Sequence, residues 1–592
     1  MTSSSRWNLG VASSAARVAP RAAWAWWLAT GAIVLAGLAL RATALDFGLP
    51  AVYNPDEIAI VSRALAFAKG DLNPHNFLYP TFFFYVLFAW IGLSFVVGRL
   101  SGQVASLAAF QDRFFVDPSG VYLAGRWLGA LCGALTTGAT AVLGRTWFDA
   151  PTGLAAAALL AAAPTAVMDA HYVKHDVPAT LVVVLALWRL ARCWPEGGAA
   201  GAVPLRALLS AAAVCGIAWS THYYTVFLAF PLAATVIQAR RGGGWRAVAG
   251  GLAAAGAAGA AVFLALSPFL LVEPGTAWRD VVANRQIVVD RAAGAGPFPY
   301  LGRYVELLAT AGVTLPVAAL SAIGTALLCL SDPRRALLPL SFALPFVLFI
   351  SHTVPATRYL NPVLPVAALM AAWALRRLAA ALMPARQGAV LAVLTALSAA
   401  VPLSDSLRVV RFFGQDDTRT VAARAITAHV PDGATVLVQP YSVQLAQSRE
   451  GLEEALRERL GSLDALPTRS RLRLAVSPWP RPSYRVLWLG DGGLDEDKIY
   501  IEYADLRPDP LAALRRRGVG YVVLKRDRDP DAAAAPLAAA LARGARRLAS
   551  VSPYREETAA GPRPEPFLHN VDAVIHRGLR RPGPVVDVFA LD

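Results

Sequence analysis

The stretch "WAWWLATGAIVLAGLAL" (residues 24–40) carries no charged side chain over 17 consecutive positions. A helix needs roughly 17–25 mostly apolar residues to cross a bilayer, so this stretch predicts a membrane span. Arg6, Arg17 and Arg21 precede it, and "ATA" (42–44) resembles a signal-peptidase site. The apolar run is too long for a signal peptide. We therefore expect an uncleaved first span behind a cytoplasmic tail of residues 1–21.

Similar apolar runs continue along the chain to residue 404. Only 16% of the 592 residues are charged and 56% are hydrophobic, which excludes an ordinary soluble protein of this length. The net charge of +15 would suit nucleic acid, but in a membrane protein Lys and Arg mark cytoplasmic loops, so we expect no nucleic-acid partner. We identify twelve apolar runs, at residues 22–40, 79–98, 121–145, 152–168, 178–194, 206–220, 222–238, 246–271, 306–330, 335–351, 360–378 and 387–404.

Arginine clusters predict the orientation of these runs. The clusters at 240–246, 334–335 and 376–386 should face the cytoplasm together with the basic N-terminus. Twelve crossings would put them on opposite sides, whereas eleven crossings put them together. We expect the run at 79–98 to lie along the outer face, because its "PTFFFYVLFAW" (80–90) is aromatic, as interfacial segments are. Dividing another run into two spans, or joining two runs into one, would also place the arginine clusters and the N-terminus on the same side.

The chain after residue 413 changes character, since charged residues become frequent. The stretch "DDTRTVAARAITAHVPDGATVLVQPY" (416–441) predicts a capped helix, a turn and a strand. Further strands are expected at 485–490 and 520–525, and helices near 449–459 and 531–547. The expected fold is therefore an α-helical polytopic membrane protein of 11–12 spans (22–413) with a soluble α/β domain (414–592). The parity of the spans places that domain, and a first outer loop at 45–120, outside the cell.

The first polar motif, "YNPDEIAIVSRALAFAKGDLNPHNFLYP" (53–80), follows the first span. Pro55 is tolerated at the start of a helix, and the apolar spacing after it predicts an amphipathic helix on the membrane surface. Asp56 and Glu57 would lie in its first turn. One interpretation is that the two acids only complement the helix dipole, with Asn54 as the cap; the other is that they are chemical groups of a site.

The second motif, "DAHYVKHDVP" (169–178), lies between two apolar runs and contains His171, Lys174, His175 and Asp176. A loop between spans needs polar residues, which is the simpler interpretation. However, ionisable groups at membrane depth are costly and are usually functional.

The third motif is "ATRYLNPVLP" (356–365), with Arg358 and Tyr359 at the outer end of a span. An outer cation departs from the positive-inside trend. Arg358 either reaches lipid phosphates or binds an anionic ligand. Weaker candidates are Tyr79 and His222, for which an aromatic belt at the membrane surface is the alternative. Arg126 either pairs with an acid of the first loop or anchors its helix.

Five segments together resemble one family. "PDE" (55–57), "GDLNPHNFLYP" (70–80), "RWLGA" (126–130), "HYVKHDVPATL" (171–181) and "RYLNPVLP" (358–365) occur in the order found in GT-C glycosyltransferases. The chain is most similar to the group of protein O-mannosyltransferases and lipid A aminoarabinose transferases. The resemblance covers roughly residues 22–410, and the start of the tail, "DTRTVAARAITAHVPDGATV" (417–436), also resembles the extracytoplasmic domain of bacterial members.

The resemblance implies a reaction. A sugar passes from a polyprenyl-phosphate donor to a hydroxyl of an acceptor lipid, glycan or protein at the outer face of a bacterial-type inner membrane, with inversion. By the same resemblance Asp56 or Glu57 is the catalytic base, Asp176 is a second catalytic acid and Arg358 holds the carrier phosphate. Chemistry agrees: a departing phosphate needs cations, here Lys174 and Arg358 beside Tyr359, and the acceptor hydroxyl needs a carboxylate to take its proton.

Further roles follow for the polar residues around these groups. We expect substrate contacts from His171, His175, Tyr79 and His222. The family's usual "HPP" reads "NFLYPTF" (76–82) here, so no catalytic role passes to His75. The resemblance implies no required cofactor, although a divalent metal would suit the paired acids Asp56, Glu57 and Asp176.

Two other functions fit a chain with this much hydrophobic sequence. A transporter or flippase of lipid-linked sugars would need ionisable groups near the membrane midplane or repeated halves, and the sequence has neither. A non-catalytic membrane scaffold with a binding domain is the second alternative. Loss of sugar transfer on replacing Asp56 or Glu57 would distinguish the enzyme from both.

Overall fold

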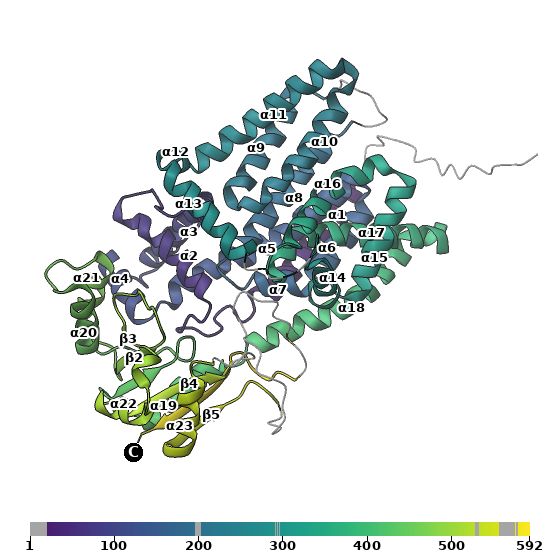
Figure 1. Ribbon diagram of the computed structural model, residues 1–592. Coiled ribbons are helices and arrows are strands. Elements are labelled where there is room, and N and C mark those ends of the chain that lie inside the picture. The colour runs from purple at the N-terminus through teal and green to yellow at the C-terminus, as the bar shows by residue number, and fades with distance from the viewer. Residues whose placement is uncertain are drawn as a thin grey trace, which may run out of the picture.

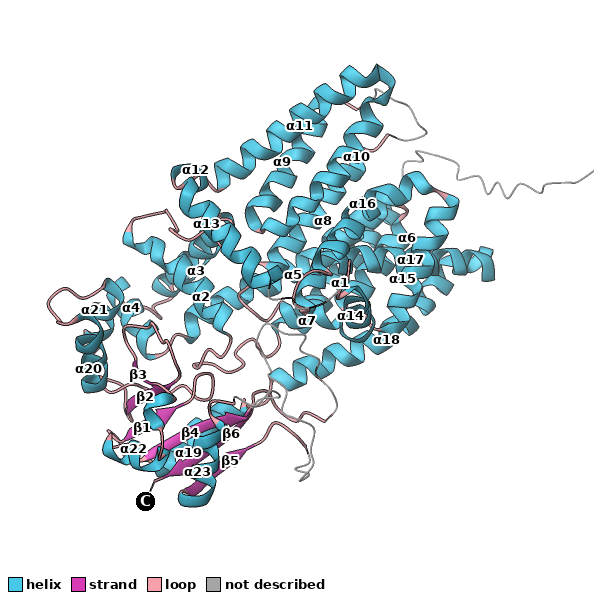
Figure 2. Ribbon diagram, in the orientation of Figure 1, coloured by secondary structure: helices cyan, strands magenta, loops and turns pink. Residues whose placement is uncertain are grey.

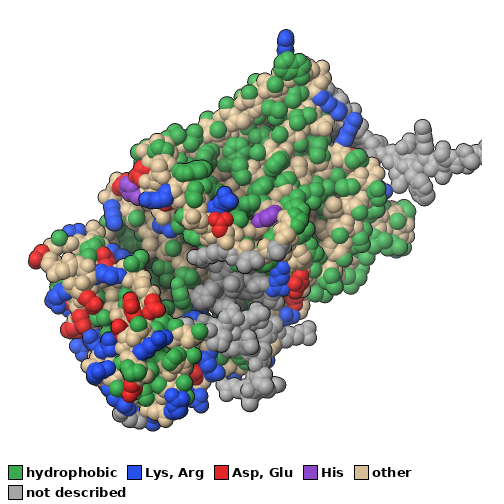
Figure 3. Space-filling view, in the orientation of Figure 1, with side chains coloured by type: hydrophobic (Ala, Val, Ile, Leu, Met, Phe, Trp, Pro, Cys, Tyr) green, Lys and Arg blue, Asp and Glu red, His purple; other side chains and the backbone are tan. Residues whose placement is uncertain are grey.

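The computed structural model describes residues 20–195, 203–290, 292, 294, 296–526, 532–555, 575 and 578–591. A large bundle of helices is joined to a small domain with a sheet (Figure 1). The strands are confined to that small domain (Figure 2). Charged side chains gather on its surface, whereas hydrophobic side chains cover most of the visible face of the bundle (Figure 3). This division confirms the expected fold class.

The bundle consists of apolar helices. Seven helices among the described residues are long and apolar enough to cross a membrane, and three shorter apolar helices accompany them. This agrees with an integral membrane protein, while the expected eleven crossings stay a prediction. The helices of the bundle are α1 (Pro20–Ala42), α3 (Phe82–Leu100), α5 (Ser119–Trp147), α6 (Ala150–Ala161), α7 (Pro164–Asp169), α8 (Asp176–Arg192), α9 (Leu205–Thr221), α10 (Ala229–Arg240), α11 (Gly244–Leu266), α15 (Leu315–Ser331), α16 (Pro333–Ile350), α17 (Leu364–Leu382) and α18 (Gln387–Phe413).

Shorter helices connect the helices of the bundle. They are α2 (Pro55–Ala66), α4 (Leu107–Val116), α12 (Phe269–Val272), α13 (Pro274–Arg285) and α14 (Leu301–Leu307). In Figure 1 the helices α2, α3 and α4 lie on the side of the bundle that faces the sheet domain.

Close packing in the bundle depends on small residues. A Cβ at Gly324 of α15 would overlap the carbonyl oxygen of Met370 in α17, and a Cβ at Gly153 of α6 would overlap that of Ala141 in α5. Without bulky side chains at these positions the helix backbones approach closely, which favours association inside a bilayer.

Helices α1 and α5 run antiparallel. At one end, Trp26 donates a hydrogen bond from Nε1 to the carbonyl oxygen of Ala150 (3.1 Å), and the guanidinium of Arg145 lies 4.5 Å from the Trp26 ring centroid. At the other end, Arg126 donates to the carbonyl oxygens of Leu45 and Phe47 at 2.7 and 2.8 Å. The chain between these helices, which includes α3, therefore leaves and returns on the same side.

This geometry supports the expectation that residues 79–98 lie along one face. Helix α3 is by itself long and apolar enough to cross, but its two ends belong to a segment that makes no net crossing. Helix α4, which follows it, contacts α21 (Thr468–Leu474) of the tail domain. The outer orientation of that face stays a prediction.

The tail domain is an α/β fold with one six-stranded sheet of order β3-β2-β1-β4-β6-β5. Strands β3, β2, β1 and β4 are parallel, and β6 is antiparallel to both β4 and β5. The expected helices and strands are present. Its elements are α19 (Thr418–His429), β1 (Thr435–Val438), α20 (Arg449–Leu460), α21 (Thr468–Leu474), β2 (Arg485–Leu489), β3 (Ile499–Ile501), α22 (Pro510–Arg516), β4 (Tyr521–Arg526), α23 (Ala535–Gly544), β5 (Arg546–Val551) and β6 (Val585–Ala590).

The tail domain is fixed to the chain just before α2. The side chain of Gln444 accepts a hydrogen bond from the amide of Val52 (3.2 Å) and donates one to its carbonyl oxygen (2.6 Å). The hydroxyls of Tyr53 and Thr420 are 2.9 Å apart, and the Arg419 guanidinium lies 3.9 Å from the Tyr53 ring centroid. These contacts position the tail domain against the start of α2.

Candidate active site

A cavity of about 560 Å³ opens at the end of the bundle where α2 and α13 lie. Six segments of the chain contribute its walls: α2, the chain around Tyr79, the turn before α8, the segment after α9, α13 with the residues that follow it, and the end of α16 with the segment after it. Eight of the ten side chains proposed from the sequence line it, namely Asp56, Tyr79, Lys174, His175, Asp176, His222, Arg358 and Tyr359.

Asp56 lies in the first turn of α2. The Asn54 side chain caps this helix by accepting a hydrogen bond from the Asp56 amide (3.0 Å), and Pro55 is the first helical residue. The carboxylate oxygen Oδ2 of Asp56 is 3.1 Å from Nζ of Lys174 and 3.5 Å from Nη1 of Arg358. A carboxylate and two cations thus meet at the cavity wall.

Glu57, the next residue, faces the opposite way. Its two carboxylate oxygens accept hydrogen bonds from Nε and Nη2 of Arg126, each at 3.0 Å, and neither side chain is more than 1% exposed. This confirms the expected pair between Arg126 and an acid of the first loop. Glu57 also accepts a hydrogen bond from the amide of Val173 (3.0 Å), which holds the turn that carries Lys174 beside α2.

The turn before α8 is held from its other side by Asn361. The Asn361 amide nitrogen donates to Oδ2 of Asp169 (2.5 Å) and to the carbonyl oxygen of Arg358 (3.0 Å). Arg358 in turn donates from Nη2 to the Tyr359 hydroxyl (3.2 Å). Because one amide joins the two segments, the second and third sequence motifs form a single wall.

Aromatic rings cover the side of the cavity behind the charged groups. Tyr79 stacks on His175, with centroids 4.3 Å apart and planes 14° apart, and His222 stacks on Tyr224 at 3.6 Å. Burial lowers the pKa of His175 to about 3 and lowers the pKa of His222 well below its usual value. Both imidazoles are therefore neutral near pH 7 and add stacking surface rather than charge.

The structure places His171 outside the cavity, contrary to the expected substrate contact. Its ring nitrogens lie 2.8 Å from the carbonyl oxygen of Val167 and 3.0 Å from that of Thr43, and the side chain is fully buried. It also packs against Phe47 and Phe413. His171 thus holds the turn together rather than facing a ligand.

Further residues line the cavity, namely Asn284 and Arg285 of α13 and His352 and Thr353 after α16. Arg285 is one of four arginines of the loop 272–305, with Arg279, Arg291 and Arg303, of which the sequence suggests that one could contact a ligand phosphate. Asn284, His352 and Thr353 escaped the sequence analysis, because they lie in segments of ordinary polar composition.

His75 forms a separate contact between loops. Its Nε2 is 2.8 Å from Oδ2 of Asp71, and its Nδ1 is 2.7 Å from Oε1 of Glu273. Hydrogen bonds to Asp71 and Glu273 raise the pKa of His75 above its usual value. The contact joins the loop after α2 to the start of α13.

The carboxylates do not fit a divalent metal. Within the described ranges no group of three or more His, Cys, Asp or Glu side chains is placed to hold an ion. Glu57 is bound to Arg126, and Asp56 is already neutralised by two cations. The donor set that remains is too small for Mg²⁺ or Mn²⁺.

The chain is similar to one protein family and to several solved structures. The model of the family described as dolichyl-phosphate-mannose-protein mannosyltransferase matches residues 119–271. No curated protein matches the chain significantly. The crystal structure of ArnT from Cupriavidus metallidurans in the apo state has a TM-score of 0.53 and 16% sequence identity, and the match covers 96% of this chain and 98% of that one. ArnT bound to undecaprenyl phosphate matches with a TM-score of 0.51, 16% identity and the same coverage. The chain therefore has the ArnT-like fold and resembles the GT-C glycosyltransferases, as the sequence motifs predicted.

Proposed function

We propose that the chain is a membrane glycosyltransferase that moves a sugar from a polyprenyl-phosphate donor to an acceptor hydroxyl at the outer face of the membrane, with inversion. The observation that carries this proposal is the meeting of Asp56, Lys174 and Arg358 at the wall of a cavity of about 560 Å³. An acid next to two cations is what this transfer needs, because one group must accept a proton while others stabilise a departing phosphate.

The donor phosphate would bind to Lys174 and Arg358. The bond between the sugar's anomeric carbon and the phosphate oxygen breaks as the acceptor oxygen bonds to that carbon. The electron pair of the breaking bond stays with the phosphate, which leaves as polyprenyl phosphate. Bidentate contacts to phosphate are a strength of arginine, and Arg285, which also lines the cavity, is placed to add a third cation.

The acceptor proton would pass to Asp56. In the free protein Lys174 and Arg358 lie against this carboxylate, and nearby positive charge lowers a carboxylate's proton affinity. A bound phosphate competes for the same cations. Donor binding would therefore make Asp56 a stronger base at the moment when the acceptor arrives.

Asp176 is the second catalytic carboxylate of this proposal. It is the first residue of α8 and lines the same cavity as Asp56. Glu57 takes a structural role instead, since Arg126 and the Val173 amide occupy both of its oxygens.

The carrier lipid would follow the apolar part of the cavity. Its walls include Phe227, Val281, Val288, Val289 and Phe349. A lipid-linked substrate explains why the site lies at the end of membrane helices. We further propose that the cytoplasm contains residues 1–21 and that the cavity and tail domain face outside.

The location of the charged groups favours an enzyme over a transporter. Transport sites need ionisable groups near the midplane, whereas these groups lie beside the loops at one end of the bundle. A flippase that moves the same lipid would also use Lys174 and Arg358, so the two functions have to be separated by chemistry.

The test is release of polyprenyl phosphate by purified protein in lipid vesicles, with a panel of polyprenyl-phosphate sugars. We expect Asp56→Asn to lower transfer by about 10²- to 10⁴-fold, the usual contribution of a general base, and Asp176→Asn to lower it as well. Lys174→Gln and Arg358→Gln should weaken donor binding more than acceptor binding. Arg279→Gln is the matched control, because Arg279 is a cation of α13 that does not line the cavity. Movement of the intact donor across the bilayer without release of polyprenyl phosphate would refute the transferase and support transport.

A further inference from the structure

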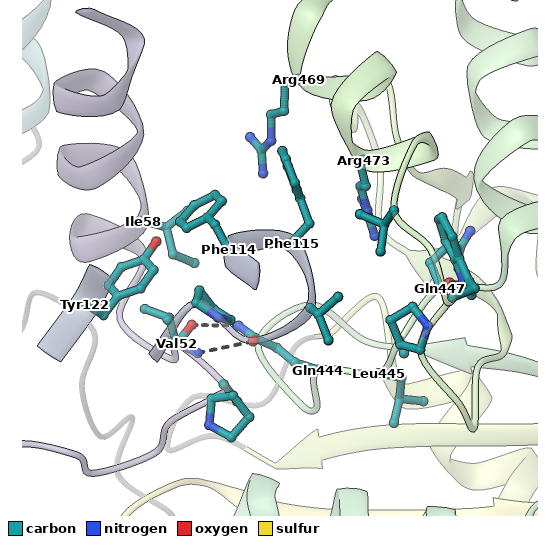
Figure 4. Close-up of a pocket in the computed structure, with 18 residues that line it drawn as sticks. Val52, Ile58, Phe114, Phe115, Tyr122, Gln444, Leu445, Gln447, Arg469 and Arg473 are labelled. Carbon is teal, nitrogen blue, oxygen red and sulfur yellow. Dashed lines mark hydrogen bonds between the residues drawn. The ribbon is translucent and has the colours of Figure 1, made fainter. Parts of the chain in front are cut away.

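Helix α2 separates the candidate active site from a second pocket. Asp56 and Ile60, four residues apart, face the cavity described above, whereas Ile58 faces away from it and lines a pocket of about 400 Å³. Residues two positions apart in a helix point in nearly opposite directions. The second pocket lies between the bundle and the tail domain (Figure 4).

The bundle and the tail domain supply different walls of this interdomain pocket. Phe114 and Phe115 come from the end of α4 and Tyr122 from the start of α5, while Trp479 comes from the tail domain. Aromatic faces carry negative charge density and pack well against polarised C–H groups. Such rings form suitable platforms for the apolar faces of sugar rings.

Two cations reach the same pocket from α21. Arg469 and Arg473 are four residues apart on this helix and both line the pocket. In Figure 4 the guanidinium of Arg469 lies beside Phe114 and Phe115. Like charges at this spacing repel one another, and an anion bound between them would relieve the repulsion.

The two cations differ in their direct carboxylate contacts. Arg473 pairs with Asp497 at 2.6 Å, whereas Arg469 forms no ion pair with any residue that the structure describes. Burial lowers the pKa of Arg473, and the nearby Arg469 lowers it further against the opposing effect of Asp497. Arg469 acts on a carboxylate only at longer range: after the larger effects of Lys498 and Tyr500, it helps to lower the pKa of Asp495.

Amide side chains complete the pocket. Gln444 and Gln447 line it, and Nε2 of Gln447 is buried without a hydrogen-bond partner in the described part of the chain. A buried donor of this kind costs free energy until an acceptor reaches it. Aromatic walls, amides and a pair of guanidinium groups are together suited to a ligand with ring faces, hydroxyls and negative charge.

We infer that the interdomain pocket binds an anionic saccharide, meaning a sugar that carries carboxylate or phosphate groups, separately from the donor cavity. Guanidinium groups bind both kinds of anion in bidentate fashion. The inference does not depend on the proposed transfer reaction, because it concerns binding at a wall of α2 that the donor does not touch. An acidic peptide lacks the sugar faces that the aromatic walls match, and it becomes a competing outcome of the test.

The experiment measures binding of tetragalacturonic acid to the full-length chain in detergent, by saturation-transfer NMR and by titration. Maltotetraose is the neutral control, and inorganic phosphate and hexaglutamate are the anionic controls without sugar rings. We expect tetragalacturonic acid to bind, and each control to bind at least about tenfold more weakly, because charge-assisted hydrogen bonds and ring stacking each contribute on the order of a factor of ten.

Variants of α21 locate the site. Arg469→Gln should weaken binding of tetragalacturonic acid by about tenfold or more, while binding of the polyprenyl-phosphate donor stays unchanged. Arg471→Gln removes the same charge from the same helix at an exposed position that does not line the pocket, so it should leave binding unchanged. Equal losses in both variants would mean general attraction to a basic surface and would overturn the inference. Equal binding of hexaglutamate or of phosphate would assign the pocket to an acidic peptide or to an adventitious ion only, and either result overturns it.

Discussion

Replacing Glu57 by Gln should destabilise the fold, whereas replacing Asp56 by Asn should strongly lower transfer and leave the fold intact. Glu57→Gln keeps the shape of the side chain but removes the charge that faces Arg126 across two hydrogen bonds of 3.0 Å. Removing one partner of a buried ion pair costs about 3–5 kcal/mol, because the other charge is left buried and unpaired.

The free-energy cost of Glu57→Gln should lie at the lower end of that range, because Arg126 keeps its other contacts. Arg126 keeps its hydrogen bonds to the carbonyl oxygens of Leu45 and Phe47, and its guanidinium lies 3.9 Å from the Phe47 ring centroid. We therefore expect a loss of about 3 kcal/mol. At about 2 °C per kcal/mol, the lower value for large domains, the apparent Tm should fall by roughly 6 °C.

Asp56 has a different environment. Its side chain is 27% exposed, and its pairs with Lys174 and Arg358 are longer, at 3.1 and 3.5 Å. A partly exposed pair contributes about 1 kcal/mol or less, so Asp56→Asn should lower the Tm by less than about 2 °C. The same change should lower sugar transfer by about 10²- to 10⁴-fold.

Scanning fluorimetry in one detergent at one scan rate, combined with the transfer assay, measures both quantities. The scan rate is held constant because unfolding of such chains is often irreversible. A Glu57→Gln protein with the parent's Tm but no transfer would refute the reasoning and make Glu57 the base. Transfer at the parent's rate by the Asp56→Asn protein would also refute the reasoning, because Asp56 could then not be the base.

Three further predictions concern other parts of the chain. The contact between His75 and its two carboxylate neighbours should be complete below about pH 6.5, the usual pKa of histidine, and should weaken as the pH rises through the raised pKa. Hydrogen exchange of residues 71–77, corrected for intrinsic rates, should therefore accelerate with pH in the parent, and a His75→Gln variant should lack this step. Gly324→Ala should cost about 1–3 kcal/mol by overpacking, while Gly256→Ala, where a Cβ meets nothing within 4 Å, should not destabilise; equal Tm values would contradict the packing argument. A cysteine at Ser101 in a cysteine-free chain should react with an impermeant thiol reagent added outside cells, and labelling only after permeabilisation would reverse the orientation.

Much of the cavity could be predicted because its polar residues occur where apolar runs end. Asp56, Lys174, Asp176, Arg358 and Tyr359 belong to different motifs, yet all line one cavity. Charged groups are tolerated in such a chain mainly at the ends of spans, and the ends that share one side of the membrane lie close together. The positions of the polar motifs, together with the expected number of membrane crossings, therefore predicted which side chains lie close together.

The division of labour between Asp56 and Glu57 was not predicted, although the sequence held a signal. Glu57, Ile60, Val61 and Ala64 form the buried face of α2, at the i, i+3, i+4 and i+7 spacing of an amphipathic helix. Asp56 lies off that face. Applying the helical period to the acids as well as to the apolar residues would have assigned the buried position to Glu57.

The tail sheet was predicted only in part, for a similar physical reason. Strands β1, β2 and β4 are apolar and mostly buried, and they were expected. Strand β3 has three residues, and β5 alternates weakly and is half-exposed. Short or edge strands owe their place to a neighbour across the sheet, so the local sequence says little about them. Strand β6 was missed as well, although it lies between β4 and β5 and all six of its residues are buried.

The hydrogen bonds between Gln444 and the backbone of Val52 lie four residues before Asp56 in the chain. The tail domain is thus part of the scaffold that positions the proposed base, although it belongs to a separate fold. An exchange of tail domains between relatives would therefore put at risk the docking partner of the helix start. The residues before α2 and the loop after β1 form one docking contact, so substitutions in either should be matched by changes in the other.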